Sequence, residues 1–220
     1  MALVSRYGNT NQFQENLIKG VNNYFNPPLK WIENGMCYML TMEWILKYLE
    51  QTVKNADTAK VVFDFLTADI SELRMVANNF MAYTKGLLKI EEGKAKDVEV
   101  RRMEYIINEA AIIVRMLSRN TRTATAYLPT FPIMPTPTAL GNISLQPQTE
   151  AYFILFRFED KGKIHGHAIG MIADSNRDYY IYDPNFGIIR ATNISDVFAS
   201  VLPWYTTNIR SIRVNVLIIR

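Results

Sequence analysis

The sequence predicts an α+β fold in which a helical first half is followed by a mostly antiparallel β-sheet. From residue 36 to about residue 118, apolar side chains return every three or four positions and no proline occurs, which is typical of amphipathic helices. From about residue 150 onward, β-branched and aromatic residues dominate and the apolar pattern changes to period two, which indicates strands. A stretch rich in threonine and proline, residues 120 to 148, lies between the two parts.

The helical part divides into four predicted helices, each with one apolar stripe. They run from about Cys37 to Val53, Thr58 to Leu66, Ile70 to Tyr83 and Lys96 to Leu117. The stripe of the first helix consists of Leu40, Trp44, Ile45, Tyr48 and Leu49, and that of the last of Met103, Ile106, Ile107, Ala110, Ile113, Val114 and Leu117. Stripes of this width predict a layer of helices packed on a common core.

Five prolines in the middle segment exclude regular helix there, because proline fixes φ and lacks a backbone donor. They are Pro129, Pro132, Pro135, Pro137 and Pro147. We expect an extended crossover inside one domain that spans residues 1 to 220, and a flexible hinge is the alternative.

Five strands are predicted in the last third of the chain. They are Ala151 to Phe158, Ile164 to Ala173, Asp178 to Asp183, Gly187 to Ala191 and Ser211 to Ile219. The polar turns at residues 159–162 and 174–178 favour hairpin connections between neighbouring strands.

Composition narrows the classes of function. The 220 residues are 49% hydrophobic, enough for a proper core, and 24 basic against 21 acidic residues give a formal net charge of +3. The positive charges are scattered, so neither nucleic acid nor an anionic membrane is a predicted partner. We expect no membrane span, because no stretch approaches the ~20 apolar residues that one requires, and no secretory signal at the N-terminus.

The chain has one cysteine, Cys37, and therefore no internal disulfide. Cys37 opens the first predicted helix, where unpaired backbone N–H groups and the helix dipole favour a thiolate. The same residue heads the apolar stripe of that helix, so a small buried packing residue is the alternative interpretation.

Both histidines of the chain, His165 and His167, lie on one face of the strand predicted at residues 164–173. The other face carries Gly166, Ala168 and Gly170. Side chains this small let another element approach closely, which predicts that this face packs against the body of the protein.

A hairpin symmetric about Ser175 would place His167 directly opposite Asp183, with Cβ atoms about 4.5 to 5.5 Å apart. A carboxylate there can accept from one imidazole nitrogen and leave the other free to act as a base. His165 would face a residue beyond Pro184, which interrupts the ladder, so His167 is the better candidate base.

Two other interpretations of these residues stay open. The segment from Asp183 to Gly187 consists largely of turn formers and is compatible with a simple turn. His165, His167 and Asp183 could instead be metal ligands, because histidines two residues apart on a strand can share one ion.

Three motif blocks resemble those of the YopT-like family of papain-fold cysteine proteases, which are secreted effectors of bacterial pathogens and plant-associated bacteria. The blocks are Asn34-Gly-Met-Cys37 with Trp44 downstream, Gly166-His-Ala-Ile169 and Tyr182-Asp-Pro-Asn-Phe-Gly187. The order of cysteine, histidine and aspartate in the chain is also similar to that of the family.

The resemblance implies a papain-like fold, with a helical N-terminal lobe packed on a twisted antiparallel sheet. It implies Cys37 as nucleophile, His167 as base and Asp183 as the acid that orients the histidine. A protein substrate is implied, and a bacterial effector delivered into a host cell by a specialised secretion system. No cofactor is needed.

One position departs from the pattern of papain-like enzymes, which commonly place Gln or Asn a few residues before the cysteine to complete the oxyanion hole. Trp31 and Ile32 occupy the corresponding positions here, so Asn34 is the candidate oxyanion donor, beside the backbone N–H of Cys37.

The predicted reaction is acyl transfer through a thioester on Cys37, followed by hydrolysis. Glutamine deamidation or transfer to another acceptor would use the same triad. A noncatalytic interaction module with a papain-like fold is a further alternative, and it would carry a thiol of ordinary reactivity.

Overall fold

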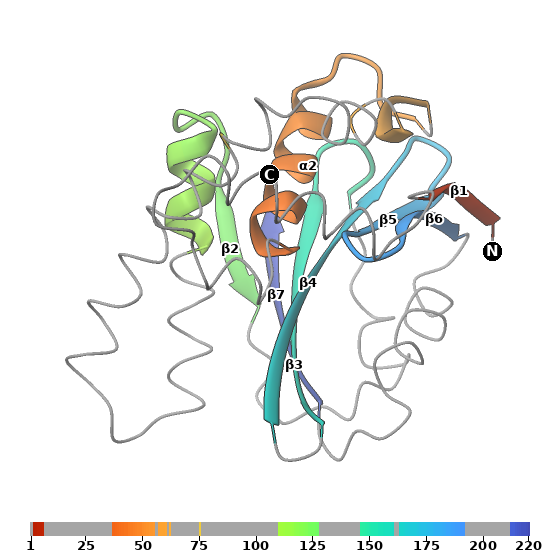
Figure 1. The fold of residues 1–220 in the computed structure, drawn as a ribbon. Coiled ribbons are helices and arrows are strands. Elements are labelled where there is room, and N and C mark those ends of the chain that lie inside the picture. Colours follow the sequence, from red (N-terminus) through yellow and green to blue (C-terminus); the bar gives the residue numbers. More distant parts are fainter. Residues whose placement is uncertain are drawn as a thin grey trace.

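One long helix lies across a seven-stranded sheet in the computed structural model, which describes residues 2–6, 37–55, 57–60, 62, 75, 110–127, 146–160, 163–191 and 212–220 (Figure 1). The helix is α2, Cys37–Glu50. The strands are β1 (Ala2–Arg6), β2 (Ala124–Tyr127), β3 (Ala151–Asp160), β4 (Lys163–Ala173), β5 (Tyr179–Asp183), β6 (Gly187–Ala191) and β7 (Ile212–Ile219). The predicted α+β class is confirmed.

Each neighbouring pair of strands in the sheet is antiparallel, in the order β1-β6-β5-β4-β3-β7-β2. The central hairpin of β3 and β4 is the longest ladder, pairing Ala151 with Ile172 at one end and Asp160 with Lys163 at the other. Figure 1 shows this hairpin extending well beyond the shorter β5 and β6. One end of β4 therefore projects past β5.

Helix α2 packs on the face of β4 that carries small residues, as the sequence predicts. A Cβ atom added to Gly170 would lie 3.0 Å from Cε3 of Trp44 and 3.2 Å from Cγ1 of Ile45. The Trp44 ring also lies 5.3 Å from the ring of Tyr182, between centroids. Because the strand offers almost no side chain at this point, the helix backbone can approach the sheet closely.

The predicted stripe of α2 is buried, and burial extends to most of the helix. The buried residues are Tyr38, Met39, Leu40, Thr41, Met42, Glu43, Trp44, Ile45, Leu46, Tyr48 and Leu49. The C-terminal end of the helix is held by Arg122, whose Nη2 donates to the carbonyl oxygen of Leu49 at 2.5 Å. The helix that carries the cysteine is thus a core element fixed on several sides.

Outside α2, residues 57–60, 62, 75 and 110–117 are helical, which agrees with the three other predicted helices at those positions. Ala110 and Val114 are fully buried, whereas Ile112 and Met116 are exposed, so the predicted stripe of the last helix is correct where it is described. The remaining parts of these helices lie outside the described residues, as do residues 128–145 of the threonine- and proline-rich segment.

All five predicted strands are present, with ends within two residues of the prediction. Two further strands, β1 and β2, were not predicted, and they form the two edges of the sheet. Strand β2 lies in the segment predicted as an extended crossing, and it pairs with β7. Both are short and pair with strands far along the chain, so no neighbouring hairpin turn marks them as strands in the sequence.

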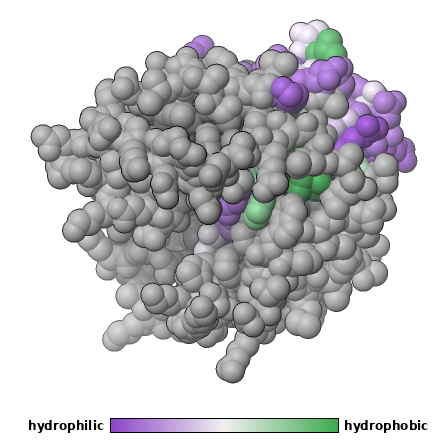
Figure 2. Space-filling model, turned by 45° about the vertical axis from the view of Figure 1, so that its right-hand side comes forward, coloured by the Kyte–Doolittle hydropathy of each residue, from purple (hydrophilic) through white to green (hydrophobic). Residues whose placement is uncertain are grey.

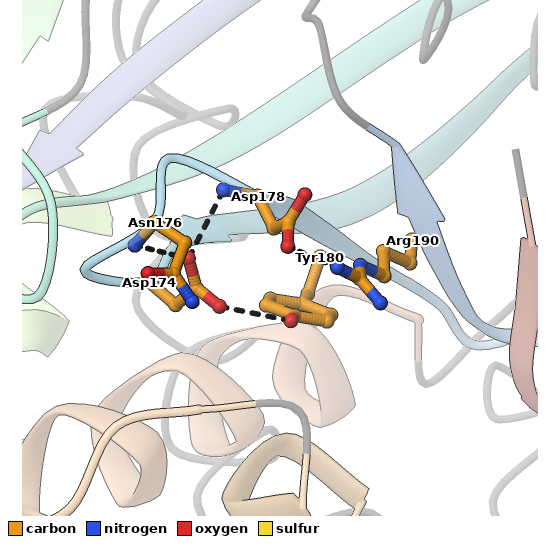
Figure 3. Close-up of polar contacts among 5 residues, drawn as sticks. All are labelled: Asp174, Asn176, Asp178, Tyr180 and Arg190. Atoms are coloured by element: carbon orange, nitrogen blue, oxygen red, sulfur yellow. Dashed lines mark hydrogen bonds and ion pairs between the residues drawn. The ribbon is translucent and has the colours of Figure 1, made fainter.

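The hairpin of β4 and β5 corrects the predicted register by two residues. Its ladder pairs Ala173 with Tyr179 and Gly170 with Tyr182, so it is symmetric about Asn176 and not about Ser175. Figure 3 shows the cause: Oδ1 of Asp174 accepts the backbone N–H groups of Asn176 and Asp178, at 2.8 and 3.0 Å. The turn therefore begins at Asp174.

In the part of the chain that the structure describes, no helix combines the length and the apolar character that crossing a membrane requires.

On the face drawn in Figure 2, the described residues at the upper right are mainly hydrophilic, and hydrophobic ones are visible near the centre.

Candidate active site

Cys37 is the first residue of α2 and is partly buried. The backbone N–H groups of a first helical turn have no partners within the helix, and with the helix dipole they present partial positive charge. A sulfur at this position is therefore in a favourable place to carry a negative charge. The sequence placed Cys37 at a helix start, and the structure agrees.

His167 lies on the part of β4 that projects past β5, since the ladder between these strands ends at Gly170 and Tyr182. Its side chain is buried, with 5% of the residue exposed, and Asp183 at the end of β5 is fully buried. The Nε2 atom of His167 and Oδ1 of Asp183 are 3.0 Å apart.

The two residues are not directly opposite, as the predicted register had them. Continuing the observed ladder places Ile169 opposite Asp183, so His167 and Asp183 are diagonal neighbours. A shift of two residues keeps both side chains on the same face of the sheet, and the diagonal distance is within reach of a long side chain. The predicted contact is present, although the predicted pairing is wrong.

Asp183 is held by the turn that follows it. Its Oδ1 accepts the backbone N–H of Asn185 at 2.8 Å, and its carbonyl oxygen accepts the N–H of Phe186 at 3.0 Å. Gly187, with φ of 115°, then leads the chain into β6. The interpretation of this segment as a turn is correct, and the turn fixes the carboxylate that contacts His167.

The electrostatics of the histidine follow from these contacts. Burial lowers the pKa of the His167 imidazole, but the charge of Asp183 and its hydrogen bond, together with Cys37, outweigh burial and raise that pKa to about 10. The imidazole is therefore protonated at neutral pH.

The pKa of the Cys37 thiol is shifted in the opposite direction. Burial and, to a smaller extent, the charge of Asp183 raise the pKa of Cys37, but the hydrogen bond with His167, the charge of His167 and a backbone hydrogen bond with Ala168 outweigh them, so the pKa is lowered. A raised histidine pKa and a lowered cysteine pKa together favour a thiolate and imidazolium pair at neutral pH.

The structure brings together Cys37, His167 and Asp183, and it does not describe the position of Asn34. His165 lies in β4, and its side chain is outside the described part of the chain. Among the described residues, no group of three His, Cys, Asp or Glu side chains could hold a metal ion.

Sequence reasoning missed the backbone groups that complete the site. The amide of Asn185 fixes the aspartate, and the backbone of Ala168 contacts the thiol. Asp followed two residues later by Asn is a known signal for the first of these, because Asp side chains accept from the amide two positions on. The second depends on tertiary packing and has no local signal.

The fold and the thiol, imidazole and carboxylate together define a papain-type cysteine peptidase. The chain belongs to the Peptidase_C58 family, described as Yersinia/Haemophilus virulence surface antigen, whose model matches residues 3–210. This agrees with the YopT-like resemblance found in the sequence.

A solved structure gives independent support for the fold. The crystal structure of the Pseudomonas avirulence protein AvrPphB matches with a TM-score of 0.58 and 12% sequence identity, covering 91% of this chain and 94% of that chain. At this identity the likeness is one of fold, and it confirms the predicted papain-like architecture. A search of curated proteins found no match.

Proposed function

We propose that this peptidase cleaves a protein substrate with Cys37 as nucleophile, His167 as general base and acid, and Asp183 as the group that orients the histidine. The observation that carries the proposal is the buried contact of 3.0 Å between Nε2 of His167 and Oδ1 of Asp183, on a histidine that also hydrogen-bonds the thiol at the start of α2. Nucleophile, base and orienting acid are thus linked in one chain of contacts.

The tautomer follows from the geometry. Because Nε2 of His167 is engaged by Asp183, Nδ1 is the nitrogen that exchanges a proton with Cys37 and with the substrate. Asp183 can only accept from an imidazole that carries a proton on Nε2, so it selects the orientation in which Nδ1 faces the thiol.

The reaction then takes place in two steps. The thiolate of Cys37 attacks the carbonyl carbon of a peptide bond and forms a carbon–sulfur bond, while the imidazolium of His167 gives its proton to the departing amine as the carbon–nitrogen bond breaks. Water next attacks the thioester and gives a proton to His167. The carboxylic acid product leaves, and the thiolate and imidazolium pair is restored.

The tetrahedral intermediate carries a negative charge on oxygen that needs donors. The backbone N–H of Cys37 and the side chain of Asn34 are the proposed donors. The positive end of α2 adds a favourable field at the same point.

The biological setting of the proposal comes from the relatives. The family description names virulence antigens of Yersinia and Haemophilus, and the matching structure is an avirulence protein of Pseudomonas. We propose that this chain is a bacterial effector that acts on a host protein after delivery by a specialised secretion system. The extent of the family match supports one catalytic domain over residues 1–220.

The test is the alkylation rate of Cys37 by iodoacetamide between pH 4 and 9. The lowered thiol pKa predicts fast labelling that persists well below about pH 7, whereas an ordinary thiol reacts only as pH rises toward about 8.5. Because the chain has a single cysteine, one mass increment per molecule reports this site alone.

Two variants identify the cause of the reactivity. In His167→Ala the labelling at acid pH should be lost, because no cation remains to stabilise the thiolate, and in Asp183→Ala it should be reduced. Circular dichroism spectra should show that both variants are folded. Identical profiles in all three proteins, rising only at alkaline pH, would overturn the proposed triad.

A further inference from the structure

A buried hydrogen bond joins the helix that carries Cys37 to the strand that carries His167. The Oγ1 atom of Thr41 in α2 donates to the carbonyl oxygen of Ala168 in β4 at 3.1 Å, between residues 127 positions apart in the sequence. Both residues are completely buried. Ala168 directly follows His167, so this bond holds the strand next to the proposed base.

Cys37 reaches the same residue of β4 from one helical turn away. The thiol has a backbone hydrogen bond with Ala168, and Thr41 follows Cys37 by four positions, which places the two side chains on the same face of α2. The first two turns of the helix are therefore attached to Ala168 at two points, through a sulfur and through a hydroxyl.

The register of the sheet explains why the backbone of Ala168 can bond to a helix. The ladder between β4 and β5 ends with the pair Gly170 and Tyr182, so in the described part of the sheet β5 has no residue paired with Ala168. The hydroxyl of Thr41 donates to the carbonyl oxygen of Ala168, where a longer β5 would have continued the ladder. A buried carbonyl needs a partner of this kind.

Packing alone would not fix this arrangement. Gly170 is covered closely by Trp44 and Ile45, which brings α2 onto the sheet, but apolar contact is not directional. A hydrogen bond requires a narrow range of distance and angle. The hydroxyl therefore adds a directional constraint on the shift and rotation of the helix relative to β4, which apolar contact does not supply.

We propose that Thr41 is a positioning residue, whose hydroxyl holds the start of α2 against Ala168 so that the sulfur of Cys37 meets the imidazole of His167. The inference rests on the proposed function, because the contact it maintains is the nucleophile and base pair. Because Thr41 is completely buried and its hydroxyl is engaged by Ala168, it would act through Cys37 and His167 and not on the substrate directly.

The test compares three variants in the alkylation assay between pH 4 and 9. Thr41→Val keeps the shape and removes the hydroxyl, Thr41→Ser keeps the hydroxyl, and Tyr180→Phe removes the buried hydroxyl that donates to Asp174 at 3.0 Å in a turn away from Cys37. For Thr41→Val we expect the acid limb of the profile to move up by about one pH unit, which is about a tenfold lower rate at pH values below both the wild-type and the shifted limb, where the rate is proportional to the thiolate fraction. Thr41→Ser should restore the wild-type profile.

Tyr180→Phe is the matched control, because it also removes a buried hydrogen bond. It should lower the thermal unfolding midpoint, as Thr41→Val does, and leave the alkylation profile unchanged. If Thr41→Val does not fold, Thr41→Ala replaces it and is compared with Thr41→Ser, from which it differs only by the hydroxyl.

The outcomes separate this inference from the proposed function. The positioning role would be overturned, and the triad left intact, if the wild type shows the plateau at acid pH and the variants without the hydroxyl show the same profile. A wild-type protein without the plateau would overturn both. An equal shift in Tyr180→Phe would show that general loosening is the cause and would also overturn the role of Thr41.

Discussion

Two turns of the sheet, one on each side of β5, are built alike. In the first, Oδ1 of Asp174 accepts the N–H of Asn176, and in the second, Oδ1 of Asp183 accepts the N–H of Asn185, both at 2.8 Å. In each turn the carbonyl oxygen of the aspartate also accepts the N–H three residues later, at 3.1 and 3.0 Å. Both aspartates are buried. The two carboxylates thus share the same contact with the backbone two residues on, although Asp174 accepts a second N–H, that of Asp178.

The side-chain partner of each carboxylate makes the difference. Asp174 accepts the hydroxyl of Tyr180 at 3.0 Å (Figure 3), while Asp183 contacts the ring of His167 at 3.0 Å. A tyrosine hydroxyl closes a structural network, whereas an imidazole can exchange a proton. The comparison teaches that the turn sequence orients the carboxylate. The side chain that a neighbouring strand places against it determines whether the carboxylate is structural or functional.

The largest effect should come from an aspartate-to-asparagine substitution at the second turn. In Asp183→Asn, the amide keeps the size and an acceptor for Asn185 but loses the charge that raises the pKa of His167. Burial then opposes the charged imidazole with only Cys37 left to offset it, so the pKa of His167 falls and the thiolate loses part of the positive charge that stabilises it. We expect the alkylation rate of Cys37 at pH 6 to fall by about a hundredfold, because a thiol of ordinary pKa, about 8.5, is less than about 1% thiolate at that pH.

Asp174→Asn is the control with matching chemistry in a matching turn, and its alkylation profile should coincide with that of the wild type. An equal loss of reactivity in both variants would break the distinction between a structural and a functional carboxylate. Retention of the acid plateau in Asp183→Asn would contradict the role given to Asp183.

A smaller effect, on stability, is expected at the first turn. Asp174→Asn replaces a charged acceptor by a neutral one for Asn176, Asp178 and Tyr180, and we expect the free energy of unfolding to fall by about 1 to 2 kcal/mol. Urea denaturation followed by circular dichroism measures this change. An unaltered midpoint of denaturation would mean that the network in Figure 3 adds nothing to stability.

The sequence predicts much of this site because its parts are local. A single cysteine at the start of an apolar helical stripe, and a strand with small residues on one face, are visible without the structure. The close approach of Trp44 to Gly170 confirms what that small face implied. Helix and strand periods carry this information in a few residues each.

The sequence could not predict which residues face each other across the hairpin. The registers symmetric about Ser175 and Asn176 both keep His167 and Asp183 on one face, so the alternation of residues cannot separate them. The choice depends on Asp174 accepting two backbone N–H groups. The edge strands β1 and β2 could not be predicted either, because they pair with strands far along the chain and not with a sequence neighbour.

The smallest predicted effect concerns the residue with a positive φ angle in each turn. The first turn places a non-glycine residue, Arg177, at φ of 64°, whereas the second places Gly187 at φ of 115°. The left-handed region costs an ordinary residue about 1 kcal/mol, and glycine avoids this cost but loses about 0.5 kcal/mol or more to its greater freedom when unfolded. Arg177→Gly should therefore raise the free energy of unfolding by about 0.5 kcal/mol at most.

Gly187→Ala, the reverse change in the second turn, should lower the free energy of unfolding by about 1 kcal/mol, because alanine has a Cβ and cannot adopt this φ without strain. It should also reduce the acid labelling of Cys37, since Gly187 closes the turn that orients Asp183. Arg177→Gly should leave the labelling unchanged. A Gly187→Ala variant that loses stability and keeps wild-type labelling would show that Asp183 is oriented by His167 itself and not by its turn.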